Sequence, residues 1–275
     1  MRKNGAQIAV NALEQLGVKY TFGIPGTHTT EIYDALRLSK KIEPILVSHE
    51  SGGSFMADAV SRTSDSIGCL TIVPAAGLAY AMSGIGEAFL AGIPMLVITG
   101  GVRRDSGRHY QLHQVDQQKM AAAITKAQFL VREHAEITPM IFEAYRIATT
   151  GEPGPVLVEI PVEIMLFAKT IRRPKKLEVV AKGWDDRESQ IPDSTVTNLV
   201  GKLVGAKHPM IFAGWGATGA TDYLVKIAEK LQAPVAVTLQ GKSAFPNDHP
   251  LYAGCFLGAG SKPGSQLALK KHDVL

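Results

Sequence analysis

The chain contains little that would mark a secreted, disulfide-bonded or metal-binding protein. Its 275 residues include only two cysteines, Cys69 and Cys255, which lie far apart within apolar runs. A disulfide framework or a cysteine-ligated metal site needs more cysteines at closer spacing, so we expect two free thiols and no metal ligands. The first seven residues lack the apolar core of a signal peptide, and we therefore expect a cytoplasmic location.

An excess of charge is also missing. The 29 Lys and Arg residues nearly balance the 25 Asp and Glu residues, and they are spread along the chain instead of forming a basic stripe. This pattern argues against a nucleic-acid partner. The stretch from Ile67 to Val102 holds only one charge, but Pro74, Pro94 and several glycines divide it into pieces too short for a membrane helix. We expect no membrane span.

Strand-length apolar runs alternate with segments of helical periodicity. The segment 6–16 repeats apolar residues at helical spacing, and Gly17 follows in a helix-stopping position. The expected strands are 18–22, 44–47, 68–73, 95–99, 127–131, 156–160, 210–213 and 234–238. The further expected helices are 30–38, 52–62, 78–90, 136–149, 194–203 and 220–231. Continuous apolar strands that alternate with helices predict an α/β fold with a parallel sheet covered on both faces.

A change in composition divides the chain. Residues 166–192 contain a basic run and then a polar run, which is typical of an exposed linker between domains. We therefore expect a first domain over residues 1–165 and a second α/β domain over residues 193–275. The last four residues, 272–275, resemble the opening of another strand, so we expect the second domain to be truncated.

His49 and Glu50 follow a predicted strand and precede a predicted helix. The carboxyl ends of parallel strands form the edge where α/β proteins bind ligands. A carboxylate that enters an apolar pocket there loses hydration, which favours its protonated form and allows it to donate a proton. Glu50 is therefore a candidate catalytic residue. The alternative is a surface carboxylate that is stabilised by the helix N-terminus.

Two glycine-rich turns also follow predicted strands. The turn Gly23–Gly26 allows close approach of a ligand or a partner, or serves only as a turn. The segment Gly214–Gly219 matches the G-x-G-x-x-G pattern of dinucleotide sites. The next strand ends in Thr238-Leu-Gln240, without the acidic residue that holds a ribose. An NAD-dependent dehydrogenase is therefore disfavoured, and another nucleotide or a structural loop stays open.

Basic and imidazole side chains gather after the strand at 95–99. Arg103, Arg104 and Arg108 could hold an anionic substrate or phosphate, and the alternative is a solvated loop. His113 and Gln114 lie a few residues further on. An isolated histidine is more often structural than catalytic, so its position alone does not identify a role.

Taken together, the motifs resemble those of the acetolactate synthase-like enzymes, which depend on thiamine diphosphate. The matching segments, in order, are Gly23–Gly26, His49–Glu50, Val97–Gly100, Ile124–Lys126, Thr150–Pro161, Pro209–Gly214, Leu239–Pro246 and Asp248–Tyr252. The resemblance covers nearly the whole chain, and the ordered set is more specific than any single motif. It implies a pyrimidine-binding domain over residues 1–165, followed by an incomplete α/β central domain.

The resemblance also implies roles for individual residues. Glu50 matches the glutamate that hydrogen-bonds the N1′ atom of the cofactor's aminopyrimidine ring and so activates the cofactor. His113 and Gln114 are implied as substrate contacts, and Gly214 and Gly216 as contacts to a bound flavin, FAD, if one is present. The cofactor contacts implied besides Glu50 are Ile24, Pro25, Gly26, Ala76, Gly77 and Tyr80.

Several departures from the family pattern leave the substrate open. Tyr80 stands where the family commonly has Asn, and Leu112-His113-Gln114 replaces Phe-Gln-Glu. The Gly-Asp-Gly motif that holds Mg²⁺ and the cofactor's diphosphate has no match. We therefore expect a chain that is inactive alone and binds only the pyrimidine end of the cofactor. The diphosphate-binding domain of a second subunit or chain would complete a homodimer or tetramer.

The favoured hypothesis is that the protein is a carboligase or decarboxylase of 2-oxo acids. The alternatives are a decarboxylase for another 2-oxo acid or an acyl-CoA substrate, and a non-catalytic binding protein that retains the fold.

Overall fold

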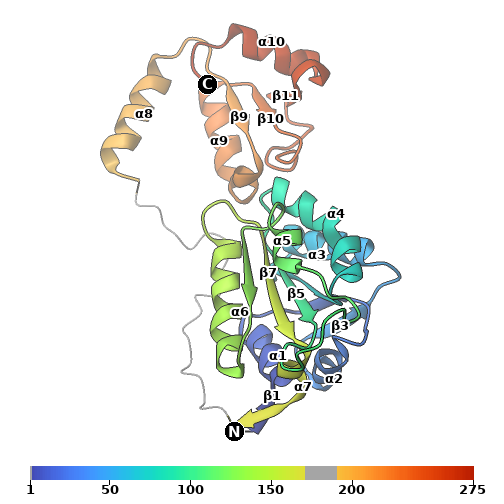
Figure 1. Ribbon diagram of the computed structural model, residues 1–275. Coiled ribbons are helices and arrows are strands. Elements are labelled where there is room, and N and C mark those ends of the chain that lie inside the picture. Colours follow the sequence, from blue (N-terminus) through green and yellow to red (C-terminus); the bar gives the residue numbers. More distant parts are fainter. Residues whose placement is uncertain (1, 171–190) are drawn as a thin grey trace. The chain divides into compact units, whose positions relative to one another are not determined.

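The structure, a computed structural model, describes residues 2–170 and 191–275 (Figure 1). The chain divides into two compact units, one on each side of the segment between these ranges. A six-stranded sheet organises the first unit, and a three-stranded sheet organises the second. Of the linker predicted over 166–192, residues 171–190 lie outside the described residues.

The large sheet of the first unit is entirely parallel. Its strands are β2 (Tyr20–Gly23), β3 (Glu43–Leu46), β4 (Gly68–Ile72), β5 (Met95–Gly101), β6 (Ala127–Leu130) and β7 (Pro155–Pro161). They lie in the order β3-β2-β4-β5-β7-β6, and every neighbouring pair is parallel. The predicted α/β fold class is therefore confirmed. All six carboxyl ends lie along one edge of the sheet.

Helices cover both faces of this sheet. They are α1 (Gly5–Gln15), α2 (Thr30–Leu38), α3 (Glu50–Thr63), α4 (Ala76–Leu90), α5 (Gln117–Ala121), α6 (His134–Thr149) and α7 (Val162–Leu166). Helix α1 packs against α2, α6 and α7, whereas α3 packs against α4. All residues of β4, β5 and β7 are buried, which explains why their sequences are continuous apolar runs.

Local sequence sets both ends of α1. Asn4 and Gln7 form a reciprocal capping box at the helix start. Gly17 adopts a positive φ of 75°, and the backbone N–H of Val18 donates to the carbonyl of Leu13 at 3.2 Å. This is the glycine-terminated C-cap that the sequence predicts.

The first unit extends beyond its predicted end at residue 165. Strand β8 (Ala168–Thr170), which the sequence analysis assigned to the linker, pairs antiparallel with β1 (Arg2–Asn4). This ladder joins segments from opposite ends of the unit. Local periodicity cannot reveal such a pairing because its two strands are far apart in the sequence.

The second unit repeats the α/β alternation on a smaller scale. Its helices are α8 (Asp193–Gly205), α9 (Thr221–Leu231) and α10 (Pro263–Lys271), with short 3₁₀ turns η1 (Trp215–Ala220) and η2 (Gly258–Gly260). Its strands are β9 (Ile211–Ala213), β10 (Val235–Val237) and β11 (Tyr252–Cys255), parallel in the order β11-β10-β9. No helix within the described ranges is long and apolar enough to cross a membrane.

The last residues begin to extend the small sheet. Val274 and Pro209 form a parallel bridge, and the N–H of Met210 donates to the carbonyl of Val274 at 2.9 Å. The next N–H, that of Ile211, donates to Pro234 on the β10 side. Because successive N–H groups of a strand point in opposite directions, Val274 lies on the free side of β9. The expected start of a further strand at 272–275 thus agrees with the pairing.

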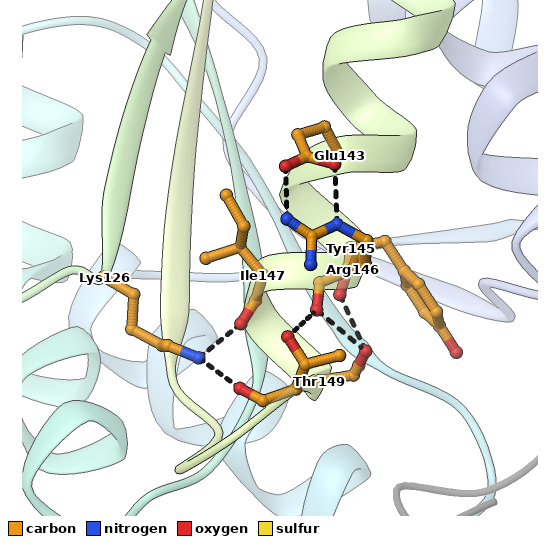
Figure 2. Close-up of polar contacts among 7 residues, drawn as sticks. Lys126, Glu143, Tyr145, Arg146, Ile147 and Thr149 are labelled. Carbon is orange, nitrogen blue, oxygen red and sulfur yellow. Dashed lines mark hydrogen bonds and ion pairs between the residues drawn. The ribbon is translucent and has the colours of Figure 1, made fainter. Parts of the chain in front are cut away.

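A lysine caps the C-terminal end of α6 (Figure 2). The ammonium group of Lys126 donates to the backbone carbonyls of Ile147 and Thr150, the second at 2.7 Å. These carbonyls lie in the last helical turn, where they lack intrahelical partners and where the helix dipole favours a cation. Partial burial lowers the pKa of Lys126.

The backbone is strained immediately before α4. Ala75 has φ 54° and ψ −93°, a conformation that costs L-residues energy because of their Cβ atom. Glycine occupies such positions with little strain.

We predict that Lys126→Met lowers the free energy of unfolding by about 1–2 kcal/mol, because two helix-end carbonyls lose a charged donor. Urea unfolding measures the change. Glu143→Gln is the matched control on the same helix, since Glu143 pairs with Arg146 at an exposed position. The control should cost less than about 0.5 kcal/mol. Equal losses in the two variants would contradict the capping role of Lys126.

We further predict that Ala75→Gly raises the free energy of unfolding by about 0.5–1 kcal/mol, because relief of backbone strain outweighs the added entropy of the unfolded chain. Ala76→Gly, one residue later and inside α4, should lower it by about the same amount. Paired urea titrations of both variants provide the measurement. Destabilisation by Ala75→Gly would show that the strain is not present in solution.

Candidate active site

Glu50 lies at the carboxyl edge of the large sheet. It is the first residue of α3, directly after the loop that follows β3, and its side chain is 7% exposed. The N–H of Ser51 donates to the Nδ1 atom of His49, which caps the helix. His49 is therefore the N-cap residue of α3, and the Glu50 carboxylate does not form the capping hydrogen bond. Glu50 does lie in the first turn of α3, as the alternative expects, but its low exposure contradicts a surface position.

The Glu50 carboxylate lies beside the first turn of α4. A Cβ atom added to Gly77 would lie 3.4 Å from Oε1 of Glu50 and 2.8 Å from the side chain of Val73. On α2, the hydroxyl of Tyr33 donates to the carbonyl of Thr71 at 2.7 Å. Burial is the main cause that raises the pKa of Tyr33, followed by the charges of Cys69 and then Glu50. Glu50 thus lies close to the central strands.

None of the hydrogen bonds and ion pairs found among residues 2–170 and 191–275 involves the Glu50 carboxylate, whose oxygens keep some contact with solvent although the residue is largely buried. Most buried carboxylates in proteins are paired, because loss of hydration is costly without compensation. An unpaired carboxylate at the ligand-binding edge of a parallel sheet is therefore suited to a hydrogen bond with a ligand.

The loop after β2 packs directly against the end of β4. A Cβ atom on Gly23 would lie 1.9 Å from the carbonyl oxygen of Thr71, and one on Gly26 would lie 2.6 Å from Val73. Glycine is required at both positions because backbone and side chains approach so closely. Within the predicted cofactor contacts, Ile24 is partly buried and Pro25 is exposed.

Val73 joins the predicted cofactor contacts into one cluster. It contacts Gly26 on one side and Gly77 on the other, and Gly77 adjoins Glu50. Ala76, at the start of α4, is exposed. Tyr80, which is 55% exposed, places its ring 4.9 Å from the ring of His49. The residues implied from separate motifs therefore lie along the same part of the sheet edge.

Ion pairs and hydrogen bonds fasten the loop 102–116 to its surroundings. Arg104 contacts the buried Glu159 of β7 at 3.1 Å, and its backbone N–H donates to Glu163 at 3.2 Å. Arg103 pairs with Asp105 at 2.5 Å within the loop. Two of the three arginines suggested as anion ligands are therefore already engaged by carboxylates of the chain.

The predicted substrate residues differ in their surroundings. Gln114 is exposed, and its side-chain oxygen accepts from the N–H of Gln111 at 2.8 Å, so it helps to shape the loop. His113 is partly buried, with a positive φ of 65°. Its ring lies 5.4 Å from the ring of His28, centroid to centroid.

Sequence reasoning did not identify His28. This residue lies in the loop between β2 and α2 and is 7% exposed. Burial is the main cause that lowers the pKa of His28, and the neighbouring His113 is the second. A signal was present, because His28 and His113 follow β2 and β5, two parallel strands whose carboxyl ends lie on the same edge.

The glycine-rich segment of the second unit forms an open turn after β9. A Cβ atom added to Gly216 would meet nothing within 4 Å, and one on Gly214 would meet only Thr238 at 3.9 Å. Neither residue has a positive φ. Packing within the unit therefore does not require glycine at Gly216. Among the described residues, no group of three or more His, Cys, Asp or Glu side chains could hold a metal ion.

Two family models match the chain in consecutive regions. The N-terminal thiamine pyrophosphate binding domain of the thiamine pyrophosphate enzymes matches residues 3–120, and the central domain of the same enzymes matches residues 196–275. The first match contains the site around Glu50, and the second contains the turn at Gly214.

Among curated proteins, the chain is similar to acetolactate synthase large subunits. It is 31% identical to that of Lactococcus lactis over 274 residues, which cover 99% of this chain and 47% of the relative. It is 32% identical to the isozyme 1 large subunit of Escherichia coli over 275 residues, or 100% and 48%. The chloroplastic acetolactate synthase of Arabidopsis thaliana is 32% identical over 256 residues, which cover 90% of this chain and 37% of the relative.

The chain spans about half the length, or less, of these curated relatives. The order of the two matched domains agrees with the two units of the structure, and the parallel sheet of the first unit carries the buried carboxylate at its ligand-binding edge. This chain belongs to the thiamine pyrophosphate enzyme family.

Proposed function

We propose that this chain supplies the pyrimidine-activating half of an enzyme that depends on thiamine diphosphate and joins or decarboxylates 2-oxo acids, as an acetolactate synthase does. The observation that carries the proposal is the buried Glu50 carboxylate, which has no partner in the described ranges. The similarity to acetolactate synthase large subunits supports the reaction class.

Val73 packs so closely against Gly26 and Gly77 that neither position has room for a Cβ atom, and Oε1 of Glu50 lies 3.4 Å from the Cβ position of Gly77. This close packing would hold the Glu50 carboxylate in one place for a ring nitrogen of the cofactor. When bound, thiamine diphosphate supplies an electron sink for the bond next to the substrate carbonyl. With the cofactor bound, Glu50 would hold a proton at its carboxyl oxygen and share it with the ring nitrogen N1′.

The remaining proposed cofactor contacts surround this position. Ile24 and Pro25 continue the loop that begins at Gly23, and Ala76 lies in the first turn of α4. Tyr80 stands one turn later against His49, the residue before Glu50. The family commonly has Asn at this position, whose amide would form hydrogen bonds. The ring of Tyr80 would instead make an apolar contact with the cofactor or with the opposing subunit.

The diphosphate and Mg²⁺ require ligands from another domain or chain. Mg²⁺ is bound through carboxylates and phosphate oxygens, and the described residues offer no cluster of such ligands. We therefore propose a homodimer or tetramer in which a diphosphate-binding domain of a second subunit or chain completes the site. Exposed apolar side chains on α3 and α4, namely Phe55, Met56, Tyr80 and Leu90, support a subunit contact there.

Other enzymes of the same reaction class would differ from an acetolactate synthase in their substrate. His113 in place of the family's usual glutamine leaves the substrate open, and a decarboxylase of another 2-oxo acid or of an acyl-CoA is the closest alternative. A non-catalytic binding protein that retains the fold would not require Glu50. The cysteines are free, and Cys69 is buried, which is compatible with the proposed cytoplasmic location.

A nucleotide such as FAD is a second proposal, for the turn at Gly214 and Gly216. The feature that favours it is the open space beside Gly216 together with the position of Val274, which gives the strand order typical of nucleotide-binding sheets. The chain builds the sheet outward from β9, first to one side through β10 and β11 and then to the other side at Val274. The turn after β9 therefore lies at the point where the strand order reverses.

We predict that Glu50→Gln lowers turnover of pyruvate by about 100-fold or more, because an amide cannot hold and return the proton. The assay uses the complete assembly with thiamine diphosphate and Mg²⁺. Glu43→Gln is the control, since Glu43 is exposed at the start of β3. The control should retain nearly normal turnover. Comparable activity of Glu50→Gln and the control would exclude the proposed role of Glu50.

We also predict that the isolated chain turns over no 2-oxo acid and binds thiamine diphosphate weakly, because the diphosphate and metal contacts lie elsewhere. Isothermal titration with thiamine and with thiamine diphosphate, each with Mg²⁺, measures the difference. Similar affinities for the two ligands are expected. Much tighter binding of the diphosphate would show that this chain itself holds the charged end.

If a nucleotide binds the second unit, we predict that Gly216→Ala weakens nucleotide binding at least about tenfold. The free energy of unfolding should not fall, because the space beside Gly216 is open and its backbone conformation tolerates a Cβ atom. Visible absorbance of the purified protein detects a bound flavin. A colourless protein that neither binds added FAD nor changes on substitution would leave the turn with a structural role only.

A further inference from the structure

A buried carboxylate on β7 contacts both ends of the loop 102–116. Glu159 is the only charged residue in β7, and it is 2% exposed. Its Oε1 atom accepts a hydrogen bond from the guanidinium of Arg104 at 3.1 Å, and its Oε2 atom accepts one from the side-chain amide of Gln118 at 2.8 Å. Arg104 is the third residue after β5, and Gln118 is the second residue of α5. One carboxylate therefore joins the start of the loop to its end.

The backbone at the two ends of the loop is also brought together at this point. The side chain of Gln117 donates to the carbonyl of Gly100 at 2.9 Å, which ties the start of α5 to the end of β5. A Cβ atom added to Gly101 would lie 2.8 Å from Oε1 of Glu159. The chain thus leaves β5 directly beside the buried carboxylate. Because loss of hydration is costly for a buried charge, Glu159 needs the contacts that the loop ends supply.

The middle of the loop is bonded mainly to itself. Every hydrogen bond that the structure describes for residues 105–114 has both partners inside the loop. Tyr110 is fully exposed, and Leu112 is 64% exposed. Tyr110 and His113 also have positive φ angles, which are unfavourable for residues other than glycine. The order of this segment therefore depends strongly on how its two ends are held.

We propose that Glu159 is a positioning residue, which holds the loop 102–116 in its binding-competent form by fixing Arg104 and Gln118. This inference rests on the proposed function, in which the site takes a 2-oxo acid. The loop follows β5 on the edge of the sheet that also carries Glu50. When one end is released, the loop opens part of the time, and only the ordered fraction binds substrate with full affinity. Glu159 thus acts on substrate affinity and leaves the proton transfer at Glu50 unchanged.

A direct contact between Arg104 and the anionic substrate is the competing explanation, because the Arg104 side chain is 48% exposed. The two explanations predict different effects of Glu159→Gln. The amide keeps the size of the carboxylate but loses its charge, which weakens the contact with Arg104. If Arg104 binds the substrate, its guanidinium becomes more available, and affinity stays equal or rises. If Glu159 holds the loop, affinity falls.

The test compares Glu159→Gln with the wild type in the complete assembly with thiamine diphosphate and Mg²⁺. We expect the KM for pyruvate to rise about 5- to 20-fold, because fewer molecules have the ordered loop. The kcat should change less than about twofold, since saturating substrate selects the ordered form. Glu143→Gln is the matched control, because Glu143 pairs with Arg146 at an exposed position on α6. The control should match the wild type in both constants.

Hydrogen exchange of the chain gives a second readout that needs neither substrate nor cofactor. In Glu159→Gln, the amides of residues 102–118 should exchange about tenfold faster, whereas those of α1 and β4 should not change. This readout still decides whether Glu159 holds the loop if the assembly turns over no pyruvate, an outcome that would count against the proposed function. Glu50→Gln should leave the exchange of the loop unchanged, so the two proposals fail separately.

Two results would overturn the positioning role. One is a KM of Glu159→Gln at or below that of the wild type. The other is faster exchange throughout the first unit, because Glu159 would then contribute only general stability. Gln118→Met removes the amide contact at the other end of the loop and should raise the KM in the same direction. It decides the outcome if Glu159→Gln fails to fold, and an unchanged KM in that variant would contradict the inference.

Discussion

The candidate site depends on one constraint, which is that parallel strands place all their carboxyl ends on one edge of the sheet. Residues that are far apart in the chain are thereby brought together there: Gly26 after β2, Glu50 after β3 and Gly77 after β4. Val73 packs against both glycines, and the largely buried Glu50 makes no hydrogen bond or ion pair among the described residues. A ligand that accepts or donates a hydrogen bond at this carboxylate accounts best for its position.

The site combines closely packed glycines with one strained backbone position. Glycines provide close approach at Gly23 and Gly77, while Ala75 carries strain where α4 begins. Residues that cost stability in this way are concentrated at functional sites in folded proteins. The exposed Tyr80, whose ring contacts that of His49 at a tilt of 47°, marks the side of the site that is open to solvent or to another subunit.

Much of this could be predicted from the sequence, since periodicity and helix stops are local. The buried strands read as apolar runs, Gly17 marks the end of α1, and the position of Glu50 follows from a strand-to-helix junction. Pairings between distant segments could not be predicted. The ladder of β8 with β1, the contact of His28 with His113 and the cap by Lys126 each depend on the folded arrangement. Short helices such as α5 are below the length at which periodicity is informative.

The central claim is tested most directly by a crystal structure of the complete assembly with bound thiamine diphosphate. The account predicts that a Glu50 oxygen lies within hydrogen-bond distance, about 2.6–3.0 Å, of the N1′ atom of the aminopyrimidine ring. The ring should lie beside Gly77 and Val73. A cofactor bound elsewhere, or a Glu50 side chain that turns into bulk solvent in the complex, would contradict it.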